Sequence, residues 1–254
     1  MLIETHAHLY FDGFDDDREA VIQRAFEANV KRIINIGIDI ETGKECIKLA
    51  EKHDGLFATV GIHPNDSARL TNAALAELGE LAGHNKVVAI GEIGLDFYWD
   101  KCPVPVQEEA FRKQIQLAKE LALPIVIHNR EAGREIVDVL KSEGIDNLTG
   151  VLHCFSEGAD IAQEVLDLGF YVSFTGNLTF KKSELPAVAQ MVPLQRLLLE
   201  TDCPFLSPEP KRGRRNEPAH VVHIAQKLAE IKQVEFGQIE EVTTENACCL
   251  FGIG

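Results

Sequence analysis

Residues 1–8 read Met1-Leu2-Ile3-Glu4-Thr5-His6-Ala7-His8, a short apolar stretch that runs into two histidines. Successive side chains of a β-strand point to opposite faces, so Glu4, His6 and His8 are predicted to share one face. Neutral imidazole is the commonest metal-ligating side chain, and a His-x-His pair at a strand end offers two nitrogens to one ion. Two surface histidines would give the same pattern, so a metal site requires further ligands elsewhere in the chain.

Short apolar runs of this kind recur along the chain and alternate with amphipathic segments. The predicted strands are Leu2–His6, Arg32–Ile36, Phe57–Gly61, Val87–Gly91, Pro124–Ile127, Gly150–His153, Phe170–Phe174 and Leu197–Thr201. The predicted helices are Asp16–Ala28, Glu41–Lys52, Ala73–Ala82, Gln107–Leu121, Arg134–Ser142, Asp160–Leu168, Ser183–Met191, Ala219–Ile231 and a closing helix at Glu240–Phe251. Parallel strands that are apolar on both faces, each followed by a helix, are typical of a closed barrel.

This alternation predicts an α/β fold, a TIM-like (β/α)8 barrel, that forms a single domain over residues 1–254. An open doubly wound sheet uses the same alternation of strands and helices. Such a sheet commonly carries a Gly-x-Gly-x-x-Gly turn after its first strand, and none is present here. The closed barrel is therefore favoured.

Composition narrows the class of protein. A net charge of −15 argues against a general basic surface for nucleic acid, although bound cations and one basic loop can reverse the field at a single site. There is no long apolar run or leader-like N-terminus, so no membrane contact is predicted and a cytoplasmic location is expected. The six cysteines lack Cys-x-x-Cys spacing and are expected to be reduced.

Polar residues with metal-binding side chains gather where the predicted strands end. In chain order they are His6 and His8, His63, Glu92 and Asp96, His128, His153, and Glu200 and Asp202. In a parallel barrel these ends meet at one mouth, where burying so many imidazoles and carboxylates is costly unless cations pair with them. The set therefore predicts a metal centre.

The mixture of nitrogen and oxygen ligands suits Mg, Mn or Zn, and also allows nickel or iron. About six protein ligands exceed what one tetrahedral ion needs, which favours two divalent ions with Glu92 as the bridging carboxylate. Cys154 and Cys203 each follow a proposed ligand by one residue, so both thiols are expected to face away from the lumen and to pack.

A basic segment, Lys211-Arg212-Gly213-Arg214-Arg215-Asn216-Glu217-Pro218, follows the last predicted strand. It is either a solvated loop or a phosphate-binding one, because loops after the seventh and eighth strands often bind phosphate in this architecture. Arg130 could reach the same pocket. The acidic run Asp12–Asp17 lacks a calcium-loop pattern and is expected to cap the first helix.

Several ordered motifs resemble the TatD family of metal-dependent hydrolases. They are ETHAH at residue 4, GIHP at 61, GEIGLDF at 91, PIVIHNR at 124, HCFS at 153, LETDCPFLSP at 199 and RGRRNEP at 212. The resemblance covers essentially the whole chain. It implies a TIM-like barrel with divalent metals that hydrolyses phosphodiester bonds of DNA, often from a strand end, and no obligate protein partner is evident.

The resemblance also implies residue roles. One ion would be held by His6, His8, Glu92 and Asp202, and the second by Glu92, His128 and His153. His63 would lie beside the reacting phosphate, and Arg130, Arg215 and Glu217 would line the substrate cleft. Position 4 departs from the family, which usually has Asp there, and Glu4 is expected to orient a metal ligand from behind.

These roles predict a deoxyribonuclease, and specifically a 3′–5′ exonuclease that grips DNA or an oligonucleotide at an end. Asp202 is the expected base for the attacking water, Glu92 bridges the ions, and His63 protonates the leaving group or holds the phosphate. The nearest alternative is a hydrolase of a small amide, lactone or phosphoester on the same barrel. A metal-stabilised scaffold without catalysis is a third reading.

Overall fold

The computed structural model describes all 254 residues, and its centre is one sheet of eight parallel strands in the order β1 to β8. The strands are β1 Leu2–Ala7, β2 Val30–Ile36, β3 Leu56–Val60, β4 Val87–Asp96, β5 Ile125–Arg130, β6 Gly150–Leu152, β7 Tyr171–Phe174 and β8 Leu197–Leu199. All eight predicted strands are therefore confirmed.

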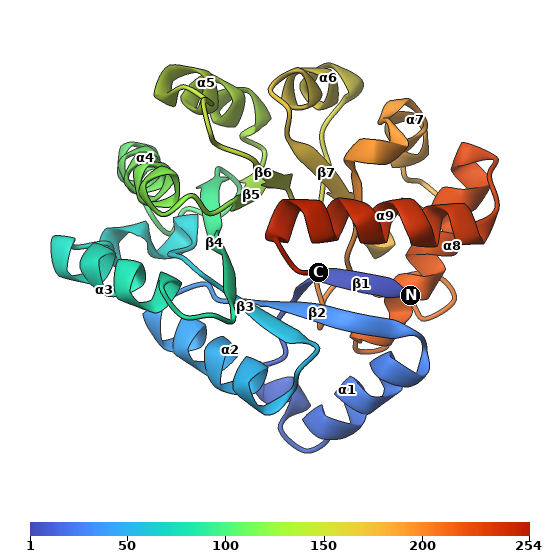
Figure 1. Ribbon diagram of the computed structural model, residues 1–254. Helices are drawn as coiled ribbons and strands as arrows, with labels where there is room; N and C mark the ends of the chain where they lie inside the picture. Colours follow the sequence, from blue (N-terminus) through green and yellow to red (C-terminus); the bar gives the residue numbers. More distant parts are fainter.

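Helices surround the sheet (Figure 1). They are α1 Arg18–Glu27, α2 Ile40–Lys52, α3 Asn72–Ala82, α4 Val104–Leu121, α5 Gly133–Glu143, α6 Ala159–Asp167, α7 Leu185–Met191, α8 Val221–Lys232 and α9 Phe236–Phe251. Each predicted helix is present, and the closing helix begins at Phe236, before the predicted Glu240. None of these helices has both the length and the apolar composition that crossing a bilayer would require.

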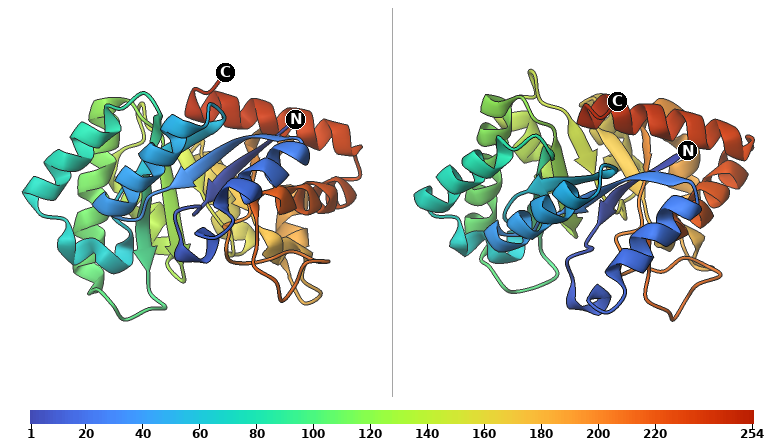
Figure 2. Two further views of the ribbon diagram at one scale, coloured as in Figure 1. Left: turned by 90° about the horizontal axis from the view of Figure 1, so that it is seen from below. Right: turned by 60° about the horizontal axis from the view of Figure 1, so that its bottom comes forward.

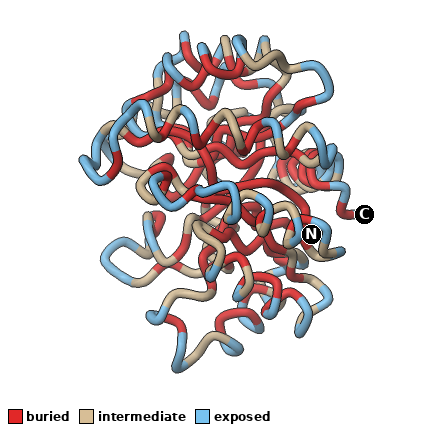
Figure 3. Tube along the Cα trace, turned by 90° about the vertical axis from the view of Figure 1, so that its left-hand side faces the viewer, coloured by how far each residue is buried: buried red, intermediate tan, exposed pale blue.

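Two apolar clusters hold the layers together. The larger, with 57 buried residues, lies between the strands and the surrounding helices. The smaller has 13, with strand residues such as Ile3, Val126 and Leu198 meeting Leu250 and Phe251 of α9. Helix α9 thus closes the end of the barrel at which both termini lie (Figure 1), and the buried positions follow the central strands (Figure 3).

Closure between the last and first strands brings their polar ends together. An isolated parallel bridge joins Ala7 to Cys203. The amide of Asp202 donates to the carbonyl of His6 at 2.9 Å, and the amide of His8 donates to the carbonyl of Cys203 at 2.9 Å. The same main-chain bonds that close the barrel therefore place Asp202 beside His6 and His8.

Three predicted C-terminal strand ends were wrong by two residues or more. β4 continues through Asp96 instead of ending at Gly91, β5 continues through Arg130 instead of ending at Ile127, and β8 ends at Leu199 instead of Thr201. β4 can continue because Gly94, at φ +141°, packs against β5 where a Cβ would lie 2.1 Å from the carbonyl oxygen of His128. β8 stops because the chain turns at Asp202, whose φ is +56°.

Candidate metal centre

Glu92 lies in the middle of the polar residues at the barrel mouth and is almost fully buried. Its Oε1 lies 2.7 Å from Nδ1 of His128 and 2.9 Å from Nε2 of His153. Its Oε2 lies 3.4 Å from Nε2 of His6 and 3.9 Å from Nε2 of His8. The two oxygens therefore face two separate histidine pairs, which is the arrangement that a bridging carboxylate requires.

Glu92 is ionised despite its burial. Burial by itself would raise the pKa of this carboxyl group, but the surrounding imidazoles of His153, His128 and His6 lower it by more, so the pKa lies well below its ordinary value. An anionic carboxylate at the centre of the histidines provides a strong attraction for cations.

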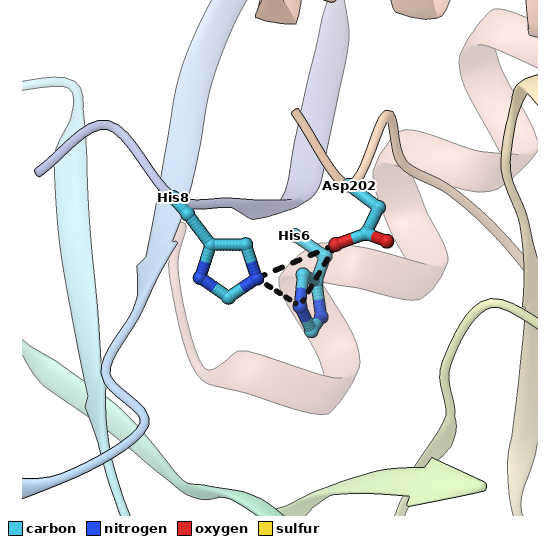
Figure 4. Close-up of side chains that lie close together, drawn as sticks. All are labelled: His6, His8 and Asp202. Carbon is cyan, nitrogen blue, oxygen red and sulfur yellow. Dashed lines mark hydrogen bonds and ion pairs between the residues drawn. The ribbon is translucent and has the colours of Figure 1, made fainter. Parts of the chain in front are cut away.

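The first group of candidate ligands comes from the closure of the barrel and consists of His6, His8 and Asp202 (Figure 4). The Nε2 atoms of His6 and His8 are 3.2 Å apart, and Oδ1 of Asp202 lies 3.3 Å from Nε2 of His8 and 3.7 Å from Nε2 of His6. Three ligand atoms of the types that bind zinc or manganese thus converge on one point.

A hydrogen bond fixes His8 in the form that can bind metal. Nδ1 of His8 lies 3.1 Å from the carbonyl oxygen of Ile36, which can only accept, so Nδ1 carries the proton. Nε2 then has its lone pair directed into the group. This pairing of the far ring nitrogen with a carbonyl is the usual support for a metal-binding histidine, so the residues present fit a divalent cation.

The second group consists of His63, Glu92 and His128. His153, predicted to hold the second ion with Glu92 and His128, contacts the same oxygen of Glu92 as His128 does. Its ring is also stacked on His6, with centroids 3.8 Å apart, and it forms a third candidate group with His6 and Glu200. His153 therefore lies between the two groups.

The tautomer of His63 does not suit metal binding, because neither ring nitrogen has a free lone pair. Its Nδ1 accepts a hydrogen bond from the amide of Asn65 at 3.1 Å, so the proton of the neutral ring is on Nε2. Burial, together with the neighbouring His128, lowers the pKa of His63 to about 3, so the ring is neutral near pH 7. A neutral ring with a proton on Nε2 suits a hydrogen-bond donor to a phosphate oxygen.

Two further carboxylates, those of Asp96 and Glu200, support the imidazole rings of the candidate ligands. Both lie where the sequence predicts strand ends, but it assigns no function to them. Oδ2 of Asp96 lies 3.2 Å from Nε2 of His128, on the side of the ring away from Glu92. Oε1 of Glu200 accepts from the amide of Cys154 at 2.5 Å and lies 3.5 Å from Nδ1 of His153. A carboxylate behind a ligand imidazole fixes its orientation and raises its basicity. Their position at the end of β4 and directly after β8 was the available sequence signal.

Substitution of Asp96 by Asn is expected to weaken metal binding about 10- to 100-fold, because His128 loses the anion that orients it. The measurement is calorimetric titration of the purified protein with Mn²⁺. Asp66→Asn is the matched control, since Asp66 lines the same cavity but its carboxylate pairs only with Arg69, at 3.7 Å. Equal affinities for Asp96→Asn and the control would show that Asp96 does not support the ligand.

Glu4, which was expected to orient a metal ligand from behind, contacts the main chain of His6. Its Oε1 accepts from the amides of His6, at 3.0 Å, and Thr201, at 2.9 Å, while Oε2 is buried without a partner. Burial raises the pKa of this carboxyl group well above its ordinary value. Glu4 therefore joins the main chains of β1 and the segment after β8, and it positions His6 through the backbone.

The metal groups open into a cavity of about 840 Å³ at the mouth of the barrel. Of the predicted substrate residues, Arg130 lines this cavity together with His63. Arg215 and Glu217 instead line a neighbouring hollow with Arg24. There Arg215 pairs with Asp17 at 2.8 Å, and Glu217 pairs with Arg24 at 2.8 Å. Their assignment to the substrate stays a prediction.

Two smaller expectations were wrong. Cys154 does not face away from the site: with φ +46° it turns into the cavity lining, and its Sγ lies 3.6 Å from Oγ1 of Thr175. Cys203 is fully buried, as expected. Asp17 precedes α1 without capping it, because its carboxylate is used by Arg215 and Arg24.

Comparison with known proteins gives consistent results. The family model described as TatD related DNase matches residues 3–252. The uncharacterized metal-dependent hydrolase YabD of Bacillus subtilis is 48% identical over 254 residues, which cover 100% of both chains. The 3'-5' ssDNA/RNA exonuclease TatD of Cronobacter sakazakii is 38% identical over 94% of this chain and 93% of its own length. The crystal structure of YJJV, a TatD homolog from Escherichia coli, superimposes with a TM-score of 0.94 at 30% identity, covering 100% of this chain and 98% of that one.

Proposed function

Because this chain belongs to the TatD family of metal-dependent hydrolases, we propose that it hydrolyses phosphodiester bonds of DNA from a strand end, in the 3′ to 5′ direction, with two divalent ions and in the cytoplasm. The observation that carries the proposal is Glu92, whose two oxygens face different histidine pairs. Two-metal sites are a recurrent solution for phosphodiester hydrolysis. The exonuclease name of the Cronobacter relative supports the same substrate class.

Specific residues would hold the ions. His6, His8 and Asp202 would hold one ion, His128 and His153 would hold the other, and Glu92 would bridge them. When bound, the ions would polarise a phosphate oxygen and lower the pKa of a water molecule.

Asp202 is suited to accept the proton of the attacking water. Burial by itself would raise the pKa of its carboxyl group, but the imidazoles of His8 and His6 lower it by more. The carboxylate is therefore ionised near neutral pH and can take a proton at its second oxygen. Its backbone, held at φ +56° by the closure of the barrel, keeps it at the mouth.

His63 and Arg130 are suited to bind the phosphate. His63 lines the cavity with its Nε2 3.7 Å from Oε1 of Glu92, so that the Nε2–H would be beside the ions and could donate to a phosphate oxygen or to the leaving oxygen. Arg130 lines the same cavity and would offset the charge that develops on the phosphate.

A single cavity at the mouth of an acidic chain favours a gripped end over a long duplex laid across the surface. We therefore expect a linear labelled oligonucleotide to be degraded while a covalently closed single-stranded circle of the same sequence stays intact. Chelator should abolish degradation and added Mn²⁺ or Mg²⁺ should restore it. Cleavage of the circle at the rate of the linear strand would exclude end gripping. Turnover of a small amide or phosphoester without cleavage of either oligonucleotide would point to the small-substrate alternative.

A further inference from the structure

Two large aromatic side chains are unusually exposed at the mouth of the metal cavity. Trp99 is 51% exposed and Phe205 is 47% exposed, and both line the cavity that contains the metal groups. The segments that carry them follow β4 and β8, and Figure 2 shows these two segments projecting from the same end of the barrel on opposite sides. Aromatic surface that borders a polar cavity from two sides suggests a ligand with flat apolar faces.

Each aromatic residue is tied to one of the metal groups. The amides of Tyr98 and Trp99 both donate to Oδ1 of Asp96 at 3.0 Å, and the other oxygen of Asp96 supports His128. On the opposite side, the amide of Phe205 donates to the carbonyl of Asp202 at 2.9 Å. The main chain at Trp99 and at Phe205 is therefore anchored to a residue of each metal group, and the two side chains start from either side of the ions' expected place.

Phe205 is further fixed by ring contacts. Its ring meets Phe11 edge-on at a centroid distance of 5.5 Å and His8 at 6.4 Å. Nearly half of the surface of Phe205 nevertheless stays open to the solvent. Phe205 thus presents exposed aromatic surface directly beside His8 of the first metal group.

Positive charge accompanies the aromatic residues, although the chain is acidic. The Nζ of Lys101 lies 5.7 Å from the ring centre of Trp99, and the guanidinium of Arg130 lies 4.5 Å from the ring centre of Tyr98. Lys101 and Arg130 both line the cavity, and neither forms an ion pair with a carboxylate. Aromatic faces interleaved with free cations are typical of surfaces that bind single-stranded nucleic acid, in which unpaired bases stack and phosphates are neutralised.

We propose that Trp99 and Phe205 stack on unpaired bases beside the reacting phosphate, so that this mouth selects base-bearing single strands. Bases inside a duplex are covered on both faces by the neighbouring pairs, and an abasic strand has no base to stack. The inference rests on the proposed function and deepens it, since it assigns substrate selection to two residues outside the metal groups.

Binding can be tested without turnover, because Trp99 is the only tryptophan in the chain. In the presence of chelator, oligothymidylate should quench the tryptophan fluorescence of the intact protein, and an abasic deoxyribose-phosphate oligomer of equal length should not. Equal responses to both oligomers, or no response to either, would overturn the stacking role of Trp99 whatever the enzymatic activity.

Kinetics test both residues. For Trp99→Ala and for Phe205→Ala, the ratio of kcat/KM between the base-bearing and abasic oligomers should fall about 5- to 150-fold, the range for loss of one base–aromatic stack. Trp99→Tyr should largely restore the ratio. Leu121→Ala is the control, because Leu121 is a 38% exposed apolar residue at the end of α4, away from the mouth.

The outcomes separate the two proposals. An unchanged ratio in Trp99→Ala and Phe205→Ala, with normal hydrolysis, would overturn base stacking and leave the nuclease function standing. Absence of metal-dependent hydrolysis in the unmodified protein would contradict the nuclease function, and base-dependent quenching would then still decide whether Trp99 binds bases.

Discussion

Replacing Glu92 by Gln is expected to lower kcat on a labelled oligonucleotide by on the order of 10³-fold or more, above the 10- to 100-fold typical of residues that only orient a ligand. The amide has nearly the same shape as the carboxylate, but it has one oxygen instead of two and no negative charge. It therefore cannot serve the His128–His153 pair and the His6–His8 pair together. The measurement is single-turnover hydrolysis at saturating Mn²⁺, with metal content determined in parallel.

The control for this variant is Glu135→Gln, which removes an exposed carboxylate in the first turn of α5 that does not line the cavity. It should keep both activity and metal content. Thermal unfolding in chelator verifies that the Glu92→Gln protein is folded. Wild-type activity in Glu92→Gln, with both ions retained, would remove Glu92 from the centre of the mechanism.

Asp202→Asn is expected to lower kcat about 10²- to 10⁴-fold, the usual range for loss of a general base. Asn tolerates a positive φ at least as well as Asp, so the backbone at φ +56° and the closure of the barrel should be preserved. The amide can still contact the first ion through its oxygen, but it cannot accept the proton of a water molecule.

Raising the metal concentration separates the two roles of Asp202. A residue that acts only as a ligand loses metal affinity, and its activity returns at saturating Mn²⁺. The base role instead predicts that kcat stays low when the metal site is full. Full recovery at high metal would therefore assign Asp202 to metal binding alone. Asp138→Asn, at an exposed position on α5, is the charge-matched control.

The barrel itself was predictable because its strands are buried on both faces and so appear as apolar runs separated by amphipathic helices. The ends of the strands were less predictable. Gly91 and Gly94 suggest a loop in the sequence, but the sheet extends past both because β5 approaches their backbone closely. Such approaches depend on the neighbouring strand, which local sequence does not specify.

The gathering of the candidate metal ligands was predictable for the same geometric reason. They lie in the second half of a strand or shortly after it, and parallel strands bring these ends together; the residues are His6, Glu92, His128, His153 and Asp202. Connecting segments were harder to predict, because their course depends on contacts distant in sequence. Arg215 lies in a separate hollow since it pairs with Asp17, 198 residues earlier.

Side-chain partners were the least predictable feature. Glu4 was expected to orient a metal ligand from behind, and it acts on the main chain, where it accepts from the amides of His6 and Thr201. The partner at Thr201 exists only because β8 closes against β1. Cys154 was expected to point outward by strand alternation, but β6 ends at Leu152 and the alternation ends with it.

The most direct test of the two-ion centre is a crystal structure of the protein soaked in Mn²⁺, with anomalous scattering recorded at the manganese edge. The account predicts two anomalous peaks on opposite sides of the Glu92 carboxylate, one beside His6, His8 and Asp202 and the other beside His128. In Glu92→Gln crystals at least one peak should be lost. A single peak in the unmodified protein at full occupancy, or two peaks that do not share Glu92, would contradict it.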